Sequence, residues 1–334
     1  MSTINVNTIL PQSGNTVTVN GLPMRSLTGG PGTINKYIGT TAPASLTANG
    51  NLMVGSGGGG ITTGNDNTAL GLYSAGVLTD GENNVIVGSN ALSATNSGSD
   101  NIAIGRAALQ QVTNPFGEVA IGHLANYQFT TAITGPNTAI GWRALWNNLT
   151  GGQNTVIGSQ TGAQITSGSD NTFLGTNSGG NITTGSNNIC IGYNSNAATA
   201  TTSNSITLGN SSNNVLRCAV TTITSLSDAR DKKEIEELPV GLEFVEKLKP
   251  VKFTWDDRNE EGKHDIEDFG FIAQDLKASQ EEVNASYLGL VYEENPEKLE
   301  ASYGKLLPVL VKAIQELSSE VKSLKEELET LKNK

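Results

Sequence analysis

The sequence predicts a mainly β repeat shaft of the β-solenoid or β-roll type, followed by an α+β domain that ends in a coiled coil. Three observations support this prediction. Glycines recur every seventeen residues through the first two thirds of the chain, charged residues gather in the last third, and an apolar heptad pattern runs through the C-terminal end. The composition changes near Ser227, and so sharp a change indicates separate domains.

The charge distribution excludes several function classes. Residues 1–226 contain 5 Lys and Arg and 6 Asp and Glu, whereas residues 227–334 contain 16 and 26, which places most of the net charge of -11 in the last third. This acidic balance argues against a nucleic-acid partner. The first residues have no signal-peptide pattern, and no apolar run approaches the roughly 20 residues of a membrane span. We therefore expect a protein made in the cytoplasm and not inserted in a membrane.

Cysteine and histidine are too sparse for a metal site. Cys190 and Cys218 lie in unlike surroundings, and we interpret both as small apolar side chains. His123 and His264 are far apart and near no partner with ligand spacing. We expect no metal and no cofactor.

The repeat contains a short unit that begins with Asn, continues with two or three small or aliphatic residues, and ends with Gly. These final glycines mark the period. Their spacing is seventeen residues, except for one step of nineteen. A second glycine column lies seven residues earlier, so each repeat has two turns. We expect two short strands and two glycine-assisted turns per coil. The glycines of the first column are Gly71, Gly88, Gly105, Gly122, Gly141, Gly158, Gly175, Gly192 and Gly209.

Two columns of apolar residues precede these glycines. The residue directly before each glycine is aliphatic, as at Leu70 and Ile157, and we predict that this column forms a buried ridge. The residue two before is mostly smaller, as at Ala103 and Cys190, and strand alternation places it on the opposite face. Such a coil has a thin core, which predicts that neighbouring chains complete it in a trimer.

The Asn-Thr-Ala-Ile-Gly unit at 137–141 and its counterpart at 154–158 resemble the head repeats of trimeric autotransporter adhesins. The resemblance covers about residues 50–212 and implies a trimeric β-roll. Because the sequence shows neither a secretion signal nor an outer-membrane barrel segment, we expect the architecture of that family and not its function.

A heptad pattern predicts a coiled coil over residues 306–332, with an aliphatic core compatible with three strands. The alternative is a surface helix packed on its own domain. The a positions are Leu307, Ile314, Val321 and Leu328, and the d positions are Leu310, Leu317, Leu324 and Leu331.

Upstream of the heptads the pattern is α+β. Residues 238–248 read as a helix ended by Pro250, residues 251–255 as a strand, and residues 269–276 as a strand running into a helix. Together with the Ser-Asp-Ala-Arg-Asp-Lys-Lys-Glu-Ile segment at 227–235, they resemble the intramolecular chaperone family. Domains of that family form the C-terminal end of endosialidase tail spikes, of many phage tail fibres and neck appendages, and of a membrane-bound animal transcription factor. The resemblance spans residues 227–334, including the approach to the coil at 301–308.

The resemblance implies a domain that assembles three chains, promotes folding of the shaft and then cuts itself off between Leu226 and Ser227. The family's catalytic serine and lysine map onto Ser227 and Lys232. A serine hydroxyl needs an adjacent base, and a lysine serves as one when desolvation or cationic neighbours, here Arg230 and Lys233, favour its neutral form. The alternative is that Ser227 caps a turn and Lys232 is a solvated surface charge.

These features predict a bacteriophage tail fibre or spike subunit, a homotrimer located in the virion and made in the host cytoplasm. Residues 1–45 would be the attachment region for phage tail or capsid proteins, residues 46–212 the shaft, residues 213–226 a linker, and residues 227–334 the chaperone. Its only activity would be an autoproteolytic serine peptidase reaction on itself. We expect binding of a host surface glycan or other receptor by Tyr127, Trp142, Arg143 and Trp146, near the irregular step; the alternative is that these side chains fill a wider core or trimer seam.

Other function classes remain open from the sequence. A polysaccharide-degrading spike would need two carboxylates about 5–10 Å apart, and the shaft offers few acids: Asp66, Asp80, Glu82, Asp100, Glu118 and Asp170. A cellular trimeric adhesin and a membrane-tethered regulator are the remaining alternatives.

Overall fold

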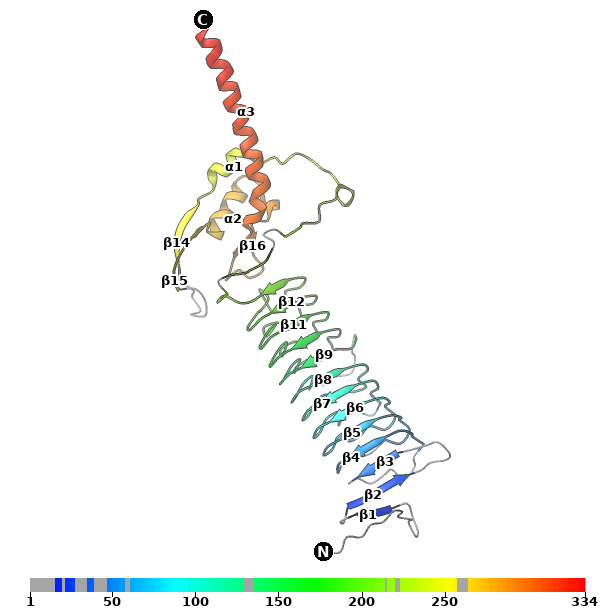
Figure 1. Cartoon of the computed structure of the whole chain (residues 1–334). Helices are drawn as coiled ribbons and strands as arrows, with labels where there is room; N and C mark the ends of the chain where they lie inside the picture. The colour runs from blue at the N-terminus through cyan, green and yellow to red at the C-terminus, as the bar shows by residue number, and fades with distance from the viewer. Residues whose placement is uncertain are drawn as a thin grey trace. The chain divides into compact units, whose positions relative to one another are not determined.

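The computed structural model describes residues 47–57, 61–95, 97–128, 135–213, 215–219, 223–256 and 264–333, together with three strands nearer the N-terminus. The chain divides into two compact units, Met1–Asn210 and Ser211–Lys334 (Figure 1). Among the residues described, the first unit holds one sheet whose strands follow sequence order, and the second holds two small sheets and the α-helices.

The three N-terminal strands lead into the solenoid. β1 (Thr16–Val19) pairs antiparallel with β2 (Leu22–Leu27), and β2 pairs antiparallel with β3 (Asn35–Ile38). β3 then pairs in parallel with the first solenoid strand. Residues 1–15 of the expected attachment region lie outside the described residues.

The shaft is a β-solenoid of about nine turns with the predicted seventeen-residue spacing. Each coil contributes one three-residue strand, paired in parallel and in register with the next. Figure 1 shows these strands stacked along one side of the unit. They are β4 (Leu52–Val54), β5 (Thr68–Leu70), β6 (Val85–Val87), β7 (Ile102–Ile104), β8 (Val119–Ile121), β9 (Thr138–Ile140), β10 (Thr155–Ile157), β11 (Thr172–Leu174), β12 (Ile189–Ile191) and β13 (Ile206–Leu208).

The expectation of two strands per coil is wrong in the described coils. Between the two glycine columns, the chain turns repeatedly because residues such as Tyr73 and Ala75 take the left-handed conformation, which interrupts an extended segment. Neighbouring coils are still joined there by backbone hydrogen bonds, for example from Thr62 N–H to the Thr79 carbonyl over 2.9 Å. The far side of the coil is therefore a stack of turns.

The prediction of a buried aliphatic ridge is also wrong. The middle residue of each strand points inward, and this is the column that contains Ala103, Val156 and Cys190. The residue before each glycine points outward, and Ile157 and Leu174 have exposed fractions of 37% and 47%. Alternation was predicted correctly, but the thin coil takes the smaller column inside. The other cysteine, Cys218, is exposed.

Glycine is required where the coils approach most closely. Gly141 has a φ of 136°, and a Cβ atom there would lie 2.2 Å from the carbonyl oxygen of Gly158. In the second column, a Cβ at Gly168 would lie 2.3 Å from the carbonyl oxygen of Gly185. Both columns thus keep adjacent coils at the spacing of a β-ladder, as the repeat predicted.

A ladder of buried asparagines runs through the solenoid beside the strands. The amide of Asn154 accepts a hydrogen bond from the Asn171 backbone N–H (3.1 Å) and donates to the Gly168 carbonyl (2.9 Å). The same contacts repeat from coil to coil, so each rung satisfies polar backbone groups that burial would otherwise leave unpaired. The asparagines of this ladder are Asn35, Asn51, Asn67, Asn84, Asn101, Asn137, Asn154, Asn171 and Asn188.

The second unit is α+β, as predicted. A short 3-10 turn, η1, lies at Ala229–Asp231, ahead of the first α-helix of the unit. No helix in the described part of the chain is both long enough and apolar enough to cross a membrane. The α-helices and strands of the second unit are α1 (Leu242–Lys247), β14 (Val251–Asp256), β15 (His264–Gly270), α2 (Ala273–Glu282), β16 (Val291–Tyr292), β17 (Glu300–Ala301) and α3 (Leu306–Lys332).

The first helix is shorter than predicted because Pro239 and Gly241 keep residues 238–241 out of it. Proline disfavours helical backbone in the residue before it, and glycine is a poor helix former. Gly241 caps α1, and Glu316 of α3 accepts a hydrogen bond from the Leu242 N–H over 2.7 Å. The core of the unit gathers around Phe244 and Leu306.

Candidate functional site

The predicted catalytic pair is in contact. The Nζ atom of Lys232 donates a hydrogen bond to the Oγ atom of Ser227 over 2.6 Å. The two residues meet because η1 reverses the chain between them. A serine hydroxyl within hydrogen-bond distance of a lysine amine is the arrangement that a Ser-Lys nucleophile requires.

The intervening residues hold this turn together. Asp228 caps η1 by accepting a hydrogen bond from the Arg230 N–H over 2.9 Å, and its carboxylate forms an ion pair with the Arg230 guanidinium over 2.6 Å. The hydrogen bonds from Arg230 lower the pKa of Asp228 below its usual value. These contacts fit an orienting role for both residues, and they direct the charge of Arg230 to Asp228.

The scissile bond is open to solvent in the single chain. Leu226 is fully exposed, and Ser227, Lys232 and Lys233 are exposed as well. A lysine acts as a base only in its neutral form, which burial or nearby positive charge favours. The single chain therefore supplies the nucleophile and the amine but does not bury the pair from solvent.

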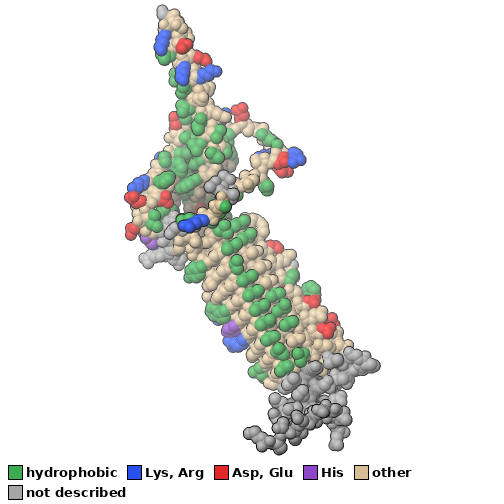
Figure 2. Space-filling view, viewed as in Figure 1, with side chains coloured by type: hydrophobic (Ala, Val, Ile, Leu, Met, Phe, Trp, Pro, Cys, Tyr) green, Lys and Arg blue, Asp and Glu red, His purple; other side chains and the backbone are tan. Residues whose placement is uncertain are grey.

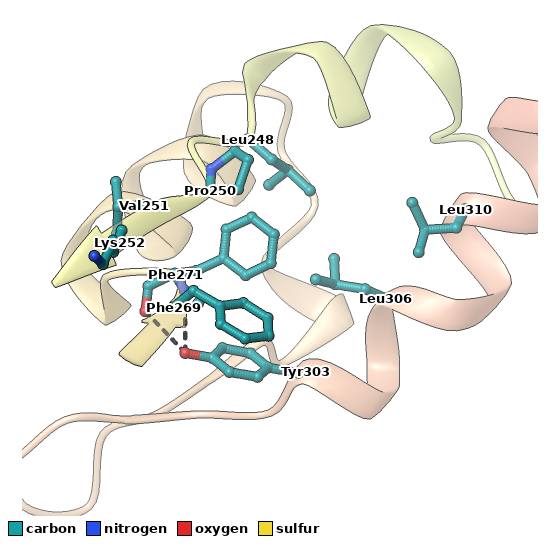
Figure 3. Close-up of a pocket in the computed structure, with 10 residues that line it drawn as sticks. Leu248, Pro250, Val251, Lys252, Phe269, Phe271, Tyr303, Leu306 and Leu310 are labelled. Carbon is teal, nitrogen blue, oxygen red and sulfur yellow. Dashed lines mark hydrogen bonds between the residues drawn. The ribbon is translucent and has the colours of Figure 1, made fainter. Parts of the chain in front are cut away.

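The second unit also carries an apolar hollow of about 590 Å³ (Figure 3). The Tyr303 hydroxyl fixes its floor by accepting a hydrogen bond from the Phe271 N–H and donating one to the Phe271 carbonyl. Leu306 and Leu310 of α3 line the hollow, and Phe269 beside them has an exposed fraction of 82%. The hollow is continuous with α3 through these two leucines.

The long helix has two apolar faces. Leu306, Val309 and Ala313 are buried against the unit. The predicted heptad positions form a separate exposed stripe, whose members are Leu307, Leu310, Ile314, Leu317, Val321, Leu324, Leu328 and Leu331. The helix spans the predicted residues 306–332, and packing on its own domain uses the other face. The stripe is thus exposed in the single chain.

On the shaft, three predicted receptor residues come together after Gly141. The Arg143 guanidinium lies over the Trp142 ring at 4.9 Å from its centroid and over the Trp146 ring at 4.5 Å. Such stacking of a cation between two aromatic faces is attractive. We call Trp142, Arg143 and Trp146 the aromatic clamp.

Other residues of the region are placed on neighbouring coils. Tyr127 lies one coil before Trp146, because the N–H of the adjacent Gln128 donates a hydrogen bond to the Trp146 carbonyl. The Tyr127 hydroxyl accepts a hydrogen bond from the Gln111 side chain over 2.9 Å. Phe116 is 64% exposed and lies in an isolated bridge.

Arg106 was not among the residues predicted for this site. Its guanidinium approaches Nε2 of His123 at 2.7 Å, and the Arg143 N–H donates to the His123 carbonyl over 3.0 Å. Burial, Arg106 and Arg143 together lower the pKa of His123. Positions 106 and 123 are one repeat of seventeen residues apart, so the sequence places them at equivalent positions of successive coils. The contact between the two side chains was nevertheless not predicted.

Glu118 takes the place of asparagine in the buried ladder. It accepts hydrogen bonds from the Asn137 N–H over 3.1 Å and from the Asn126 side chain over 2.8 Å. Burial raises the pKa of Glu118 to about 8, against the opposing effect of these hydrogen bonds. Because the carboxyl is buried, it is not placed to act on a polysaccharide.

Comparison with known families identifies one segment. Residues 227–284 match the family model described as chaperone of endosialidase. The match includes the Ser227 and Lys232 pair and ends before α3. No curated protein and no solved structure matches the chain.

A β-solenoid followed by this domain is an architecture of the tail-fibre type, with an intramolecular chaperone at its C-terminal end. The chaperone family implies homotrimer assembly.

Proposed function

We propose that this chain is the subunit of a homotrimeric bacteriophage tail fibre or spike. Its shaft would contact the host receptor, and its C-terminal third would drive assembly and then release itself at the Leu226 to Ser227 bond. The observation that carries this proposal is the 2.6 Å contact between Ser227 Oγ and Lys232 Nζ inside the segment that matches the chaperone family.

Besides the scissile peptide bond, the proposed cleavage needs only Ser227, Lys232 and a water molecule. The Oγ atom of Ser227 attacks the carbonyl carbon of Leu226, and its proton passes to Lys232. The amide nitrogen of Ser227 leaves and takes that proton, so an ester joins Leu226 to the Ser227 side chain. Water then hydrolyses the ester, which leaves a carboxylate on Leu226 and restores the hydroxyl on a new N-terminal Ser227.

Assembly would switch this reaction on. A lysine accepts the serine proton only in its neutral form, and the pair is exposed in the single chain. Packing of three chains around the turn would desolvate the amine and favour its neutral form. Cleavage would then follow folding and not precede it.

Two exposed apolar stripes support the trimer. One is the heptad face of α3, where Ile314 is 66% exposed. The other is the outward face of the solenoid strands, and Figure 2 shows rows of hydrophobic side chains along the stacked coils. Each outward strand position is Thr, Val, Ile or Leu, without a charge in any coil from β5 to β13. A continuous apolar face of this kind is typical of an interface.

The aromatic clamp and Tyr127 are the proposed receptor contact. Aromatic rings beside polar groups suit the faces of sugar rings, and loops or turns on a rigid scaffold commonly carry binding residues. Trp142 is 42% exposed and so is accessible in the chain.

Two experiments test assembly and adsorption separately. Residues 1–226 expressed alone should misassemble, whereas the full chain should give a trimer by light scattering; a soluble, protease-resistant trimer from the fragment would contradict the chaperone role. The W142A and W146A variants of the full chain should form trimers yet adsorb poorly to host cells. Trimers of these variants that adsorb like the unaltered protein would place the receptor site elsewhere.

A further inference from the structure

The aromatic clamp lies within the shaft's only concentration of positive charge. Residues 47–213 contain two arginines, one histidine and no lysine. Arg106, His123 and Arg143 lie on three successive coils and contact or face one another. Figure 2 shows a basic patch with a histidine at one edge of the stacked coils, while the visible acidic side chains of the coils lie along the other edge.

These arginines have no carboxylate partner among the residues described. The ion pairs of the described chain all lie in the second unit. Of the two acids nearest to Arg106 in sequence, Asp100 accepts a hydrogen bond from Asn83 over 3.1 Å, and Glu118 is fully buried in the asparagine ladder. The sequence of residues 129–134 contains no charged residue. The charges of Arg106 and Arg143 are therefore free to meet a ligand.

The surface beside the clamp is hollowed and incomplete in hydrogen bonds. A hollow of about 340 Å³ is lined by Arg143, Trp146, Gln160 and Thr183, among others. Two donors in the clamp, Nε of Arg143 and Nε1 of Trp146, are buried without an acceptor in the described residues. Buried donors are normally paired, so these two groups beside the hollow keep a hydrogen-bonding capacity that the described chain does not use.

We propose that this edge of the shaft binds an anionic saccharide, whose carboxylate pairs with Arg106 and Arg143 while a sugar ring lies on Trp142 or Trp146. This inference rests on the proposed receptor contact and adds the charge of the ligand to it. Guanidinium groups bind carboxylates through two parallel hydrogen bonds, and the neutral amides of the hollow suit sugar hydroxyls. An uncharged glycan would use the rings and leave both arginines without an anionic partner.

The test is an array on which each uronic or sialic acid oligosaccharide stands beside its carboxyl-reduced counterpart. Reduction replaces the carboxylate with a hydroxymethyl group and keeps the ring. The full-length protein should bind acidic members and lose about tenfold or more in affinity on reduction. Arg143→Gln should cause a similar loss for the acidic form and little for the reduced form. Asp100→Asn, which removes a charge from another corner of the coil, is the matched control and should change neither.

The outcomes separate the two claims. Equal binding of acidic and reduced members, abolished by Trp146→Ala but not by Arg143→Gln, would overturn the anionic ligand and keep the glycan contact. Binding of no saccharide on the array would overturn both. Because an ionic contact is screened by salt, binding of acidic members should also weaken between 50 mM and 500 mM NaCl, and salt-independent binding would contradict the inference.

Discussion

The side-chain amide of Asn171 donates a hydrogen bond over 3.0 Å to the side-chain oxygen of Asn154, one coil earlier. The same amide nitrogen donates to the Gly185 carbonyl over 3.0 Å, and the Asn171 oxygen accepts from the Asn188 N–H. Each rung thus connects three coils in a buried space. The ladder joins the thin coils by polar contacts where the apolar core alone is small.

Replacing one rung should weaken the shaft strongly. Asn171→Ala leaves the Gly185 carbonyl and the Asn188 N–H buried without partners, so we expect a loss of about 2–4 kcal/mol in the free energy of unfolding. Thermal unfolding of the full-length protein measures it. Gln164→Ala, on the exposed surface of the preceding coil, is the matched control and should cost less than about 0.5 kcal/mol. Equal effects of the two changes would show that the ladder is not stabilising.

Glu118 should make the stability of the shaft depend on pH. Its pKa is raised from 4.5 to about 8 in the folded chain, mainly by burial. The folded state therefore holds a proton that the unfolded state releases at lower pH, so unfolding becomes easier as the pH rises from about 4.5 to about 8. The midpoint of thermal unfolding should fall across this window.

Glu118→Gln should remove that dependence, because glutamine keeps the shape and cannot ionise. The variant should be more stable than the unaltered protein at pH 8 and similar to it at pH 5. Asp170→Asn, in a surface turn, should leave the pH profile unchanged. A profile with the same slope in Glu118→Gln would assign the effect to other groups.

Charges on the outward strand face should prevent the shaft from trimerising. In a variant with Ile157→Asp and Leu174→Asp, assembly would bury unpaired carboxylates, which costs several kcal/mol per chain. We expect the released shaft to run as a monomer or aggregate in analytical ultracentrifugation. Thr176→Asp, exposed but off the strand, should still give a trimer. A stable trimer from the double variant would place the seam on another face.

The outward position of the aliphatic column is the part of the coil that the sequence did not predict. The period, the strand positions and the alternation of two faces could be predicted, because hydrogen-bonded coils of equal length must repeat the same contacts. Which face is inside could not, since Ile157 looks more like a core residue than Ala103. The interior of a three-residue strand coil is narrow, and the larger aliphatic column remains outside.

The site was predicted unevenly for a similar reason. Ser227 and Lys232 were matched by motif, and η1 brings them together as that match required. The repeat of asparagine was visible, but its buried hydrogen bonds depend on contacts between coils that spacing does not specify. Arg106 escaped notice because its partner His123 lies in the next coil.

Cleavage at the Leu226 to Ser227 bond is the most direct test of the account. Intact mass spectrometry of the purified protein, with light scattering on the same sample, should show fragments 1–226 and 227–334 only once the chain is trimeric. Ser227→Ala removes the nucleophile and Lys232→Ala removes the base, so both should remain full-length trimers; Thr330→Ala, on the exposed end of α3, should be cut normally. Unaltered protein that trimerises and stays intact, or Ser227→Ala protein that is still cut at this bond, would contradict the assignment of the pair.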